Sequence, residues 1–240
     1  MKNKPIENHT NIINKTRPKI LFFDVNETLL DLTKMKKQIG QVLNGKEDLL
    51  SLWFTTMLQY SLVTTVSGQY KHFSTIGAAT LQMVAANNGI SISSEEARDT
   101  VINALRALPP HPEVISALTT LKQEGYTLVS FTNSSNEGVK KQFEYAGLTA
   151  YFEKMLSVED VRKFKPATEA YQWAAQKMGV NPEECMLVAA HGWDVAGAMW
   201  AGWRAAFISR PGQQLFPLAP KTEIEATDLT ELTKILVAYS

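Results

Sequence analysis

The sequence predicts an α/β fold in which a doubly wound parallel sheet carries an inserted helical segment. Three observations predict it. Short, continuous apolar runs recur along the chain, they alternate with helical patterns after residue 112, and residues 33–108 contain helical patterns with no strand between them. Strands that alternate with helices are typical of a parallel sheet covered by helices on both faces.

Four apolar runs are the expected strands. The first is KILFFD at residues 19–24, which ends in an acidic residue. The runs TLVSFTN (127–133), CMLVAA (185–190) and RAAFIS (204–209) repeat the pattern. Because such runs have no polar face, we expect strands buried on both sides.

Two helices of the core have start and stop signals. The segment NEGVKKQFEYAGL has Val139 and Phe143 near helical spacing and stops at Gly147. The segment PATEAYQWAAQKMGV opens with Pro166 and closes with Gly179. Proline at the start and glycine at the end are the usual asymmetry of a helix.

Residues 33–108 are expected to form a helical cap inserted after the first strand. LLSLWFTTMLQYSLVTTV and FSTIGAATLQMVAANNG have the pattern of successive amphipathic helices, and PPHP at 109–112 marks the return to the sheet because prolines interrupt a helix. Residues 19–32 and 109–240 then form the core. The polar residues 1–18 are expected to be a disordered N-terminal extension.

The composition favours a small-molecule enzyme. Lys plus Arg (24) balance Asp plus Glu (24), and 45% of the residues are hydrophobic, which argues against both nucleic-acid binding and disorder. No apolar run approaches the roughly 20 residues that span a bilayer. The single cysteine, Cys185, lies in an apolar run, where we expect a buried thiol. We therefore expect a cytoplasmic protein without a membrane partner.

Polar residues gather where the predicted strands end. Ligands of an open parallel sheet bind at the carboxyl ends of its strands. That rule selects Asp24 and the residues after it, Thr132 with Asn133, the region around Lys165, and the residues after CMLVAA. A helical cap that leaves directly after the first strand would close over the same edge.

Four motifs, FFDVNETLLD, VSFTNSS, KFKP and LVAAHGWDVAGA, occur in the order and spacing of the motifs of the haloacid dehalogenase superfamily. The chain therefore resembles that family over residues 20–210. The resemblance implies a haloacid-dehalogenase-like core with an inserted cap. It also implies that Asp24 is a nucleophile that forms an ester intermediate, oriented by the hydroxyl of Thr28.

The other motifs imply further roles by the same resemblance. Thr132 and Asn133 correspond to the residues that bind the anionic group of the substrate. Lys165 corresponds to the cation that neutralises charge around the nucleophile.

The sequence differs from the phosphatases of this superfamily. Those enzymes have a second Asp two residues after the nucleophile, where this chain has Asn26, and a pair of acids for magnesium, where this chain has Asp194 alone. Mg²⁺ requires a shell of several oxygen ligands, and Asn26 with Asp194 alone supplies too few of them. Phosphoryl transfer in that branch depends on the metal. We expect no metal and no cofactor.

The closer resemblance is to the 2-haloacid dehalogenases, whose tyrosine and Trp-Asp pair are matched by Tyr171, Trp193 and Asp194. In that branch the carboxylate displaces halide from C2 with inversion, and water hydrolyses the ester. Halide departure needs no general acid, which is consistent with Asn26. The resemblance implies turnover of short-chain (S)-2-haloacids to (R)-2-hydroxyacids. Dehalogenases of that branch are often homodimers, but the sequence itself does not specify the oligomeric state.

The chain also departs from the best-known dehalogenase pattern. Phe54 stands where many members have arginine, His191 ends an Ala-Ala-His stretch in place of Ser-Ser-Asn, and Asn26 with Glu27 replaces Tyr-Gly. Glu27 and His191 both follow predicted strands, so we hypothesise a dyad that activates the hydrolytic water, as in a subset of this family.

Phe54 shares its predicted helix with Trp53 and Tyr60, at spacings that can share one face. For Phe54 we expect the wall of an apolar pocket that holds the halogen and a short alkyl chain, and for the other two core packing is as good an interpretation. Two alternative functions stay open: a magnesium-dependent phosphatase, and a hydrolase that opens another carbon electrophile such as a strained ring.

Overall fold

A computed structural model describes residues 16–239, so the first 15 residues of the expected N-terminal extension lie outside the described part. The described chain has a six-stranded sheet in the order β3-β2-β1-β4-β5-β6, and every neighbouring pair is parallel. This confirms the predicted doubly wound sheet. The strands are β1 (Ile20–Phe23), β2 (Thr127–Thr132), β3 (Lys154–Ser157), β4 (Cys185–Ala189), β5 (Arg204–Ile208) and β6 (Ile224–Ala226).

The four predicted strands are β1, β2, β4 and β5, which occupy the centre of the sheet. The two strands that the sequence did not predict, β3 and β6, are its edges. Each has an exposed charged residue, Lys154 or Glu225, which breaks the continuous apolar pattern. Edge strands need no apolar residue at every position, and the pattern of a buried run therefore misses them.

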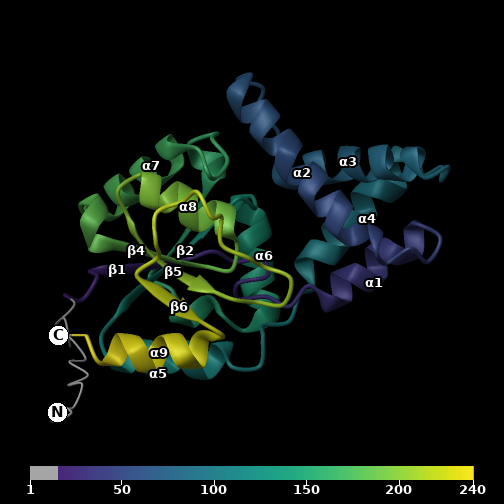
Figure 1. Ribbon diagram of the computed structural model, residues 1–240. Helices are drawn as coiled ribbons and strands as arrows, with labels where there is room; N and C mark the ends of the chain where they lie inside the picture. The colour runs from purple at the N-terminus through teal and green to yellow at the C-terminus, as the bar shows by residue number, and fades with distance from the viewer. Residues whose placement is uncertain (1–15, 240) are drawn as a thin grey trace, which may run out of the picture.

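Helices cover both faces of the sheet. In Figure 1, α5 and α9 lie side by side on one face, and α7 and α8 lie on the other. The core helices are α5 (Val114–Gln123), α6 (Asn136–Ala146), α7 (Thr168–Met178), α8 (Gly192–Trp200) and α9 (Leu229–Val237). Short 3-10 turns occur at Thr149–Tyr151, Val158–Asp160 and Pro182–Glu184.

Four helices and no strand lie between β1 and α5, and Figure 1 shows them beside the sheet rather than on its faces. They are α1 (Thr33–Val42), α2 (Leu49–Val66), α3 (Phe73–Asn87) and α4 (Ser94–Arg106). We refer to these four helices as the cap. Among the cap helices, α4 packs against α6 of the core.

The predicted helix ends are close to the observed ones. Gly147 and Gly179 end α6 and α7 in the left-handed conformation, with φ of 70° and 67°, which favours glycine. Helix α7 begins at Thr168, two residues later than Pro166 suggests. The delay has a local reason, because the backbone N–H of Lys165 is held by the side chain of Asn133 and Ala167 has an extended conformation.

Helix α2 is not amphipathic, in contrast to the sequence expectation. One stripe is buried, but the opposite side is also apolar and exposed, with Leu52, Leu62, Val63 and Val66 in solvent. By length and composition alone α2 could cross a membrane, although no run of that kind was expected from the sequence. In the structure its buried stripe packs on α3, where Trp53 Nε1 donates to the carbonyl of Gly77 at 2.8 Å.

Candidate active site

The polar residues that follow the central strands meet at one edge of the sheet. Strand order reverses beside β1, because β2 lies on one side of it and β4 on the other, and such a reversal opens a crevice at the carboxyl ends of the strands. Asp24 follows β1 directly, and its backbone N–H donates to the carbonyl of Val188 on β4 at 3.0 Å. Its side chain is almost completely buried.

Lys165 pairs with two carboxylates at this edge. Its Nζ lies 3.0 Å from Asp24 Oδ1 and 2.5 Å from Asp194 Oδ2, and it also donates to the carbonyl of Phe131 at 2.9 Å. Burial alone would lower the pKa of Lys165, but the charges of Asp194 and Asp24 outweigh burial and raise it. Lys165 is therefore a permanent cation between the two acids.

Asp24 is held in its ionised form. Burial opposes ionisation, yet the ammonium of Lys165 and the hydrogen bond from His191 hold the pKa of Asp24 well below its usual range. Thr28 adds a third partner, because its hydroxyl donates to Asp24 Oδ2 at 2.8 Å. The same hydroxyl accepts from the backbone N–H of Ala190 at 2.9 Å, which fixes the direction of its proton.

Tyr171 holds Asp194 in place, and Asn133 holds Lys165 in place. The hydroxyl of Tyr171 donates to Asp194 Oδ1 at 2.6 Å, so both oxygens of Asp194 have a partner. Asn133 accepts from the backbone N–H of Lys165 at 2.9 Å and donates to its carbonyl at 3.4 Å. Thr132 is buried beside it and accepts from the backbone N–H of Ser134 at 3.1 Å.

His191 lies between two carboxylates. Its Nδ1 is 3.0 Å from Asp24 Oδ2 and its Nε2 is 3.0 Å from Glu27 Oε2. Burial alone would lower the pKa of His191, but the hydrogen bonds and charges of Asp24 and Glu27 raise it to about 9. At neutral pH the imidazole is therefore a cation that donates from both nitrogens.

Aromatic rings surround this histidine. Phe54 from α2 and Trp193 from α8 lie nearly parallel to the imidazole, with ring centroids 6.1 Å and 5.2 Å away. The expected common face of Trp53, Phe54 and Tyr60 is not observed, because Trp53 is fully buried inside the cap and Tyr60 is exposed. Phe54 is thus the member of this set that joins the cap to the catalytic edge.

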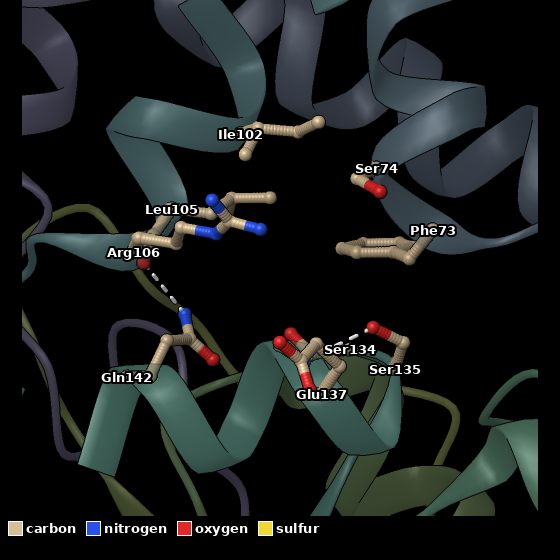
Figure 2. Close-up of a pocket in the computed structure, with 10 residues that line it drawn as sticks. Phe73, Ser74, Ile102, Leu105, Arg106, Ser134, Ser135, Glu137 and Gln142 are labelled. Atoms are coloured by element: carbon tan, nitrogen blue, oxygen red, sulfur yellow. Dashed lines mark hydrogen bonds between the residues drawn. The ribbon is translucent and has the colours of Figure 1, made fainter. Parts of the chain in front are cut away.

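A second contact between cap and core is made by Gln142, which also binds Asn26. Gln142 Nε2 on α6 donates to Asn26 Oδ1 at 2.9 Å and to the carbonyl of Leu105 on α4 at 3.0 Å. Figure 2 shows Gln142 reaching toward the cap, at one end of a small cavity of about 90 Å³ between α3, α4 and the start of α6. The orientation of Asn26 is therefore tied to the position of the cap.

The arrangement suits a carboxylate nucleophile with a protonated histidine beside it. Asp24 is ionised and held by three side chains from three parts of the chain. Between residues 16 and 239 there is no group of three or more His, Cys, Asp or Glu placed to hold a metal ion. The side chain of Asn26 is already bonded to Gln142, and the space between Asp24 and Asp194 contains the Lys165 ammonium.

Similarity to known proteins shows the family of this chain. The profile of the haloacid dehalogenase-like hydrolases matches residues 18–202. The chain belongs to this family. It is 28% identical over 217 residues to the (S)-2-haloacid dehalogenase 1 of Pseudomonas sp. (strain CBS-3), which covers 90% of this chain and 95% of the relative. It is 30% identical over 191 residues to the haloacetate dehalogenase H-2 of Moraxella sp. (strain B), which covers 79% and 85%.

Solved structures show the same fold. The L-2-haloacid dehalogenase of Xanthobacter autotrophicus superposes on this haloacid dehalogenase-like hydrolase with a TM-score of 0.85 and 22% identity, which covers 91% of this chain and 98% of the other. The fold that the four motifs implied is therefore confirmed, including helices inserted after the first strand.

Two residues that contact the site, Gln142 and Gln213, were not among the candidates from the sequence. A signal existed for Gln142, because it lies between Val139 and Phe143 on the buried side of α6, where a polar side chain needs a partner. Gln213 follows Pro-Gly in a connection between strands, and its sequence context gives no signal. Its Nε2 donates to Glu27 Oε2 at 3.0 Å.

Proposed function

We propose that this chain is a hydrolytic dehalogenase of short-chain (S)-2-haloacids, which it converts to (R)-2-hydroxyacids through an ester on Asp24. The observation that supports it is the buried, ionised Asp24 next to a histidine whose other nitrogen is bound to a second carboxylate. The relatives named above are dehalogenases of (S)-2-haloacids and of haloacetate. Their similarity extends over most of the length of this chain.

The first half-reaction forms the ester. A carboxylate oxygen of Asp24 attacks C2 of the acid, the new C–O bond forms opposite the halogen, and halide leaves with the electron pair of the broken bond. Inversion at C2 follows from this geometry. Lys165 keeps Asp24 ionised until the attack and afterwards stays paired with Asp194.

The second half-reaction frees the enzyme. Esterification removes the negative charge of Asp24, so the imidazolium of His191 loses one of its two stabilising partners and releases a proton to solvent. Glu27 continues to accept from Nε2–H, which leaves the lone pair of Nδ1 directed at the ester. A neutral His191 in this tautomer is a competent base for a water molecule.

Water then attacks the carbonyl carbon of the Asp24 ester. One proton of the water passes to Nδ1 of His191, the bond between that carbon and the alkoxide oxygen breaks, and the second proton ends on the alkoxide to give the hydroxyacid. The resting pair of Asp24 carboxylate and His191 imidazolium is restored. The balance is one haloacid and one water converted to one hydroxyacid, one halide and one proton.

The test is halide release from monobromoacetate and from each enantiomer of 2-bromopropionate, with and without EDTA. We expect bromide from monobromoacetate and the (S) enantiomer at a rate that EDTA leaves unchanged, with (R)-lactate as the product of the (S) enantiomer. An aryl phosphate assayed with magnesium is the control. Magnesium-stimulated phosphate release without bromide release would replace the proposal with a phosphatase.

A further inference from the structure

The segment between β5 and β6 crosses the catalytic edge at residues 209–217. This stretch lies beyond residues 18–202, the part that matches the family profile. Arg210 fastens its start, because Nη2 donates to the carbonyl of Thr28 at 3.0 Å and to Glu113 Oε1 at 2.6 Å. The segment is therefore bonded directly to the loop that contains Asp24 and Glu27.

A second anchor lies at the start of α8. A Cβ on Gly192 would come within 2.2 Å of the carbonyl oxygen of Gln214 and 3.1 Å of the backbone nitrogen of Phe216. Only glycine permits this close approach of the two backbones. The segment is thus fixed next to His191 on one side and next to Thr28 on the other.

Gln213 lies between these anchors and faces Glu27. Its Nε2 donates to Glu27 Oε2, the same oxygen that receives Nε2–H of His191, and both distances are 3.0 Å. Two donors therefore converge on one carboxylate oxygen. Gln213 and His191 together fix the orientation of the Glu27 carboxylate.

Glu27 has an alternative direction available. Its side chain is 21% exposed. It borders a cavity of about 590 Å³ that is also lined by Lys36 and Arg210. A carboxylate released from Gln213 could turn toward water and these two cations. Glu27 itself has a left-handed backbone, with φ of 64°, so the backbone conformation of this loop is strained and defined by its contacts.

We propose that Gln213 is a positioning residue that holds the Glu27 carboxylate on His191 and thereby fixes the imidazole tautomer needed for ester hydrolysis. This inference rests on the proposed dyad of Glu27 and His191. Gln213 touches neither the nucleophile nor the water. It is required in the second half-reaction and dispensable in the first.

The experiment compares Gln213→Leu with Gln214→Leu. The control residue is the neighbour, whose side chain is exposed. Each protein is mixed with (S)-2-bromopropionate in a single turnover, bromide release reports ester formation, and intact-protein mass reports the adduct on the enzyme. In Gln213→Leu we expect an unchanged bromide burst, hydrolysis about tenfold slower and an accumulated adduct, since one hydrogen bond to a charged group is lost. Gln214→Leu should match the wild type.

A second variant separates positioning from folding. Gln213→Glu keeps the size of the side chain and adds a carboxylate beside Glu27. The charged and titratable groups near this dyad are Asp24, which contacts His191, and Asp31, Lys36, His111 and Arg210, which line the cavity beside Glu27. The added negative charge stabilises the His191 imidazolium and raises its pKa. The acid limb of the pH–rate profile for ester hydrolysis should therefore move up by about one pH unit. A purely structural role would lower the melting temperature and leave that limb in place.

The outcomes distinguish failure of the proposed function from failure of the role of Gln213. If the wild type releases no bromide and forms no adduct, the proposed function fails and the role of Gln213 fails with it. If the wild type turns over normally and both Gln213 variants hydrolyse the adduct at the wild-type rate and pH dependence, the role of Gln213 alone is overturned.

Discussion

His191 Nδ1 lies 3.0 Å from Oδ2 of Asp24, so the proposed base of the second step touches the nucleophile of the first. While Asp24 is a carboxylate, this contact raises the pKa of His191 and keeps the imidazole protonated. Once Asp24 is an ester, the contact no longer favours the cation. The chemical state of Asp24 therefore controls the protonation of His191.

The first prediction concerns the titration of His191. In the free wild-type protein its pKa should be about 9, and Asp24→Asn should lower it because one of its two carboxylate partners is removed. NMR of ring-labelled histidine measures both values, and replacing His191 assigns its signal among the 4 histidines. An unchanged pKa in Asp24→Asn would contradict the coupling.

Replacing His191 by Asn should stop the reaction after the first step. The variant keeps the size of the site but has no base, so one equivalent of bromide should be released from (S)-2-bromopropionate and the alkyl adduct should persist on Asp24. Mass spectrometry of the peptide that contains Asp24 detects it. Wild-type turnover without a trapped adduct would remove His191 from the mechanism.

Stability should depend on His191 between neutral and alkaline pH. Its pKa rises from 6.5 to about 9 on folding, so its stabilisation is complete below pH 6.5 and disappears as the pH rises through 9. The full effect is at most about 3 kcal/mol. Urea unfolding of the wild type and His191→Asn across this range should give a stability difference that shrinks with pH. A constant difference would show that His191 is not charged in the resting protein.

Tyr171→Phe should weaken the pair of Lys165 and Asp194. The substitution removes the 2.6 Å hydrogen bond to Asp194 Oδ1 and leaves a buried acceptor unpaired, which costs about 1–3 kcal/mol of unfolding free energy. Halide release should slow as well. Tyr145→Phe, at an exposed position, is the control and should change neither quantity.

Gly197→Ala should displace Tyr171 and Pro166, which lie next to the ion pair of Lys165 and Asp194. A Cβ there would lie 2.4 Å from Pro166 Cβ and 2.7 Å from the hydroxyl of Tyr171. We expect a loss of about 1–3 kcal/mol because a packed interior has no room for the methyl group. Gly138→Ala, on another helix with a hydroxyl as its nearest neighbour at 3.0 Å, should be tolerated better. Equal stability of the two variants would contradict the close packing around α8.

The sequence by itself determined the central strands, the inserted helices and the order of the four motifs. Strands β1, β2, β4 and β5 could be predicted because burial on both faces demands continuous apolar residues. The edge strands β3 and β6 face solvent on one side and lack that pattern. Asp24, Lys165 and His191 were candidates because parallel strands present their carboxyl ends at one edge.

Only the tertiary structure decided which partners these residues have. The hypothesised pairing of His191 with Glu27 is present in the structure, with 3.0 Å between Nε2 and Oε2. That His191 also contacts Asp24, and that Gln213 shares the oxygen of Glu27 with it, was not predicted and depends on contacts between segments more than 160 residues apart in the chain. Periodicity describes the neighbours of a residue along one element. Hydrogen bonds between loops depend on the packing of all the elements that support them, and no local pattern encodes that packing.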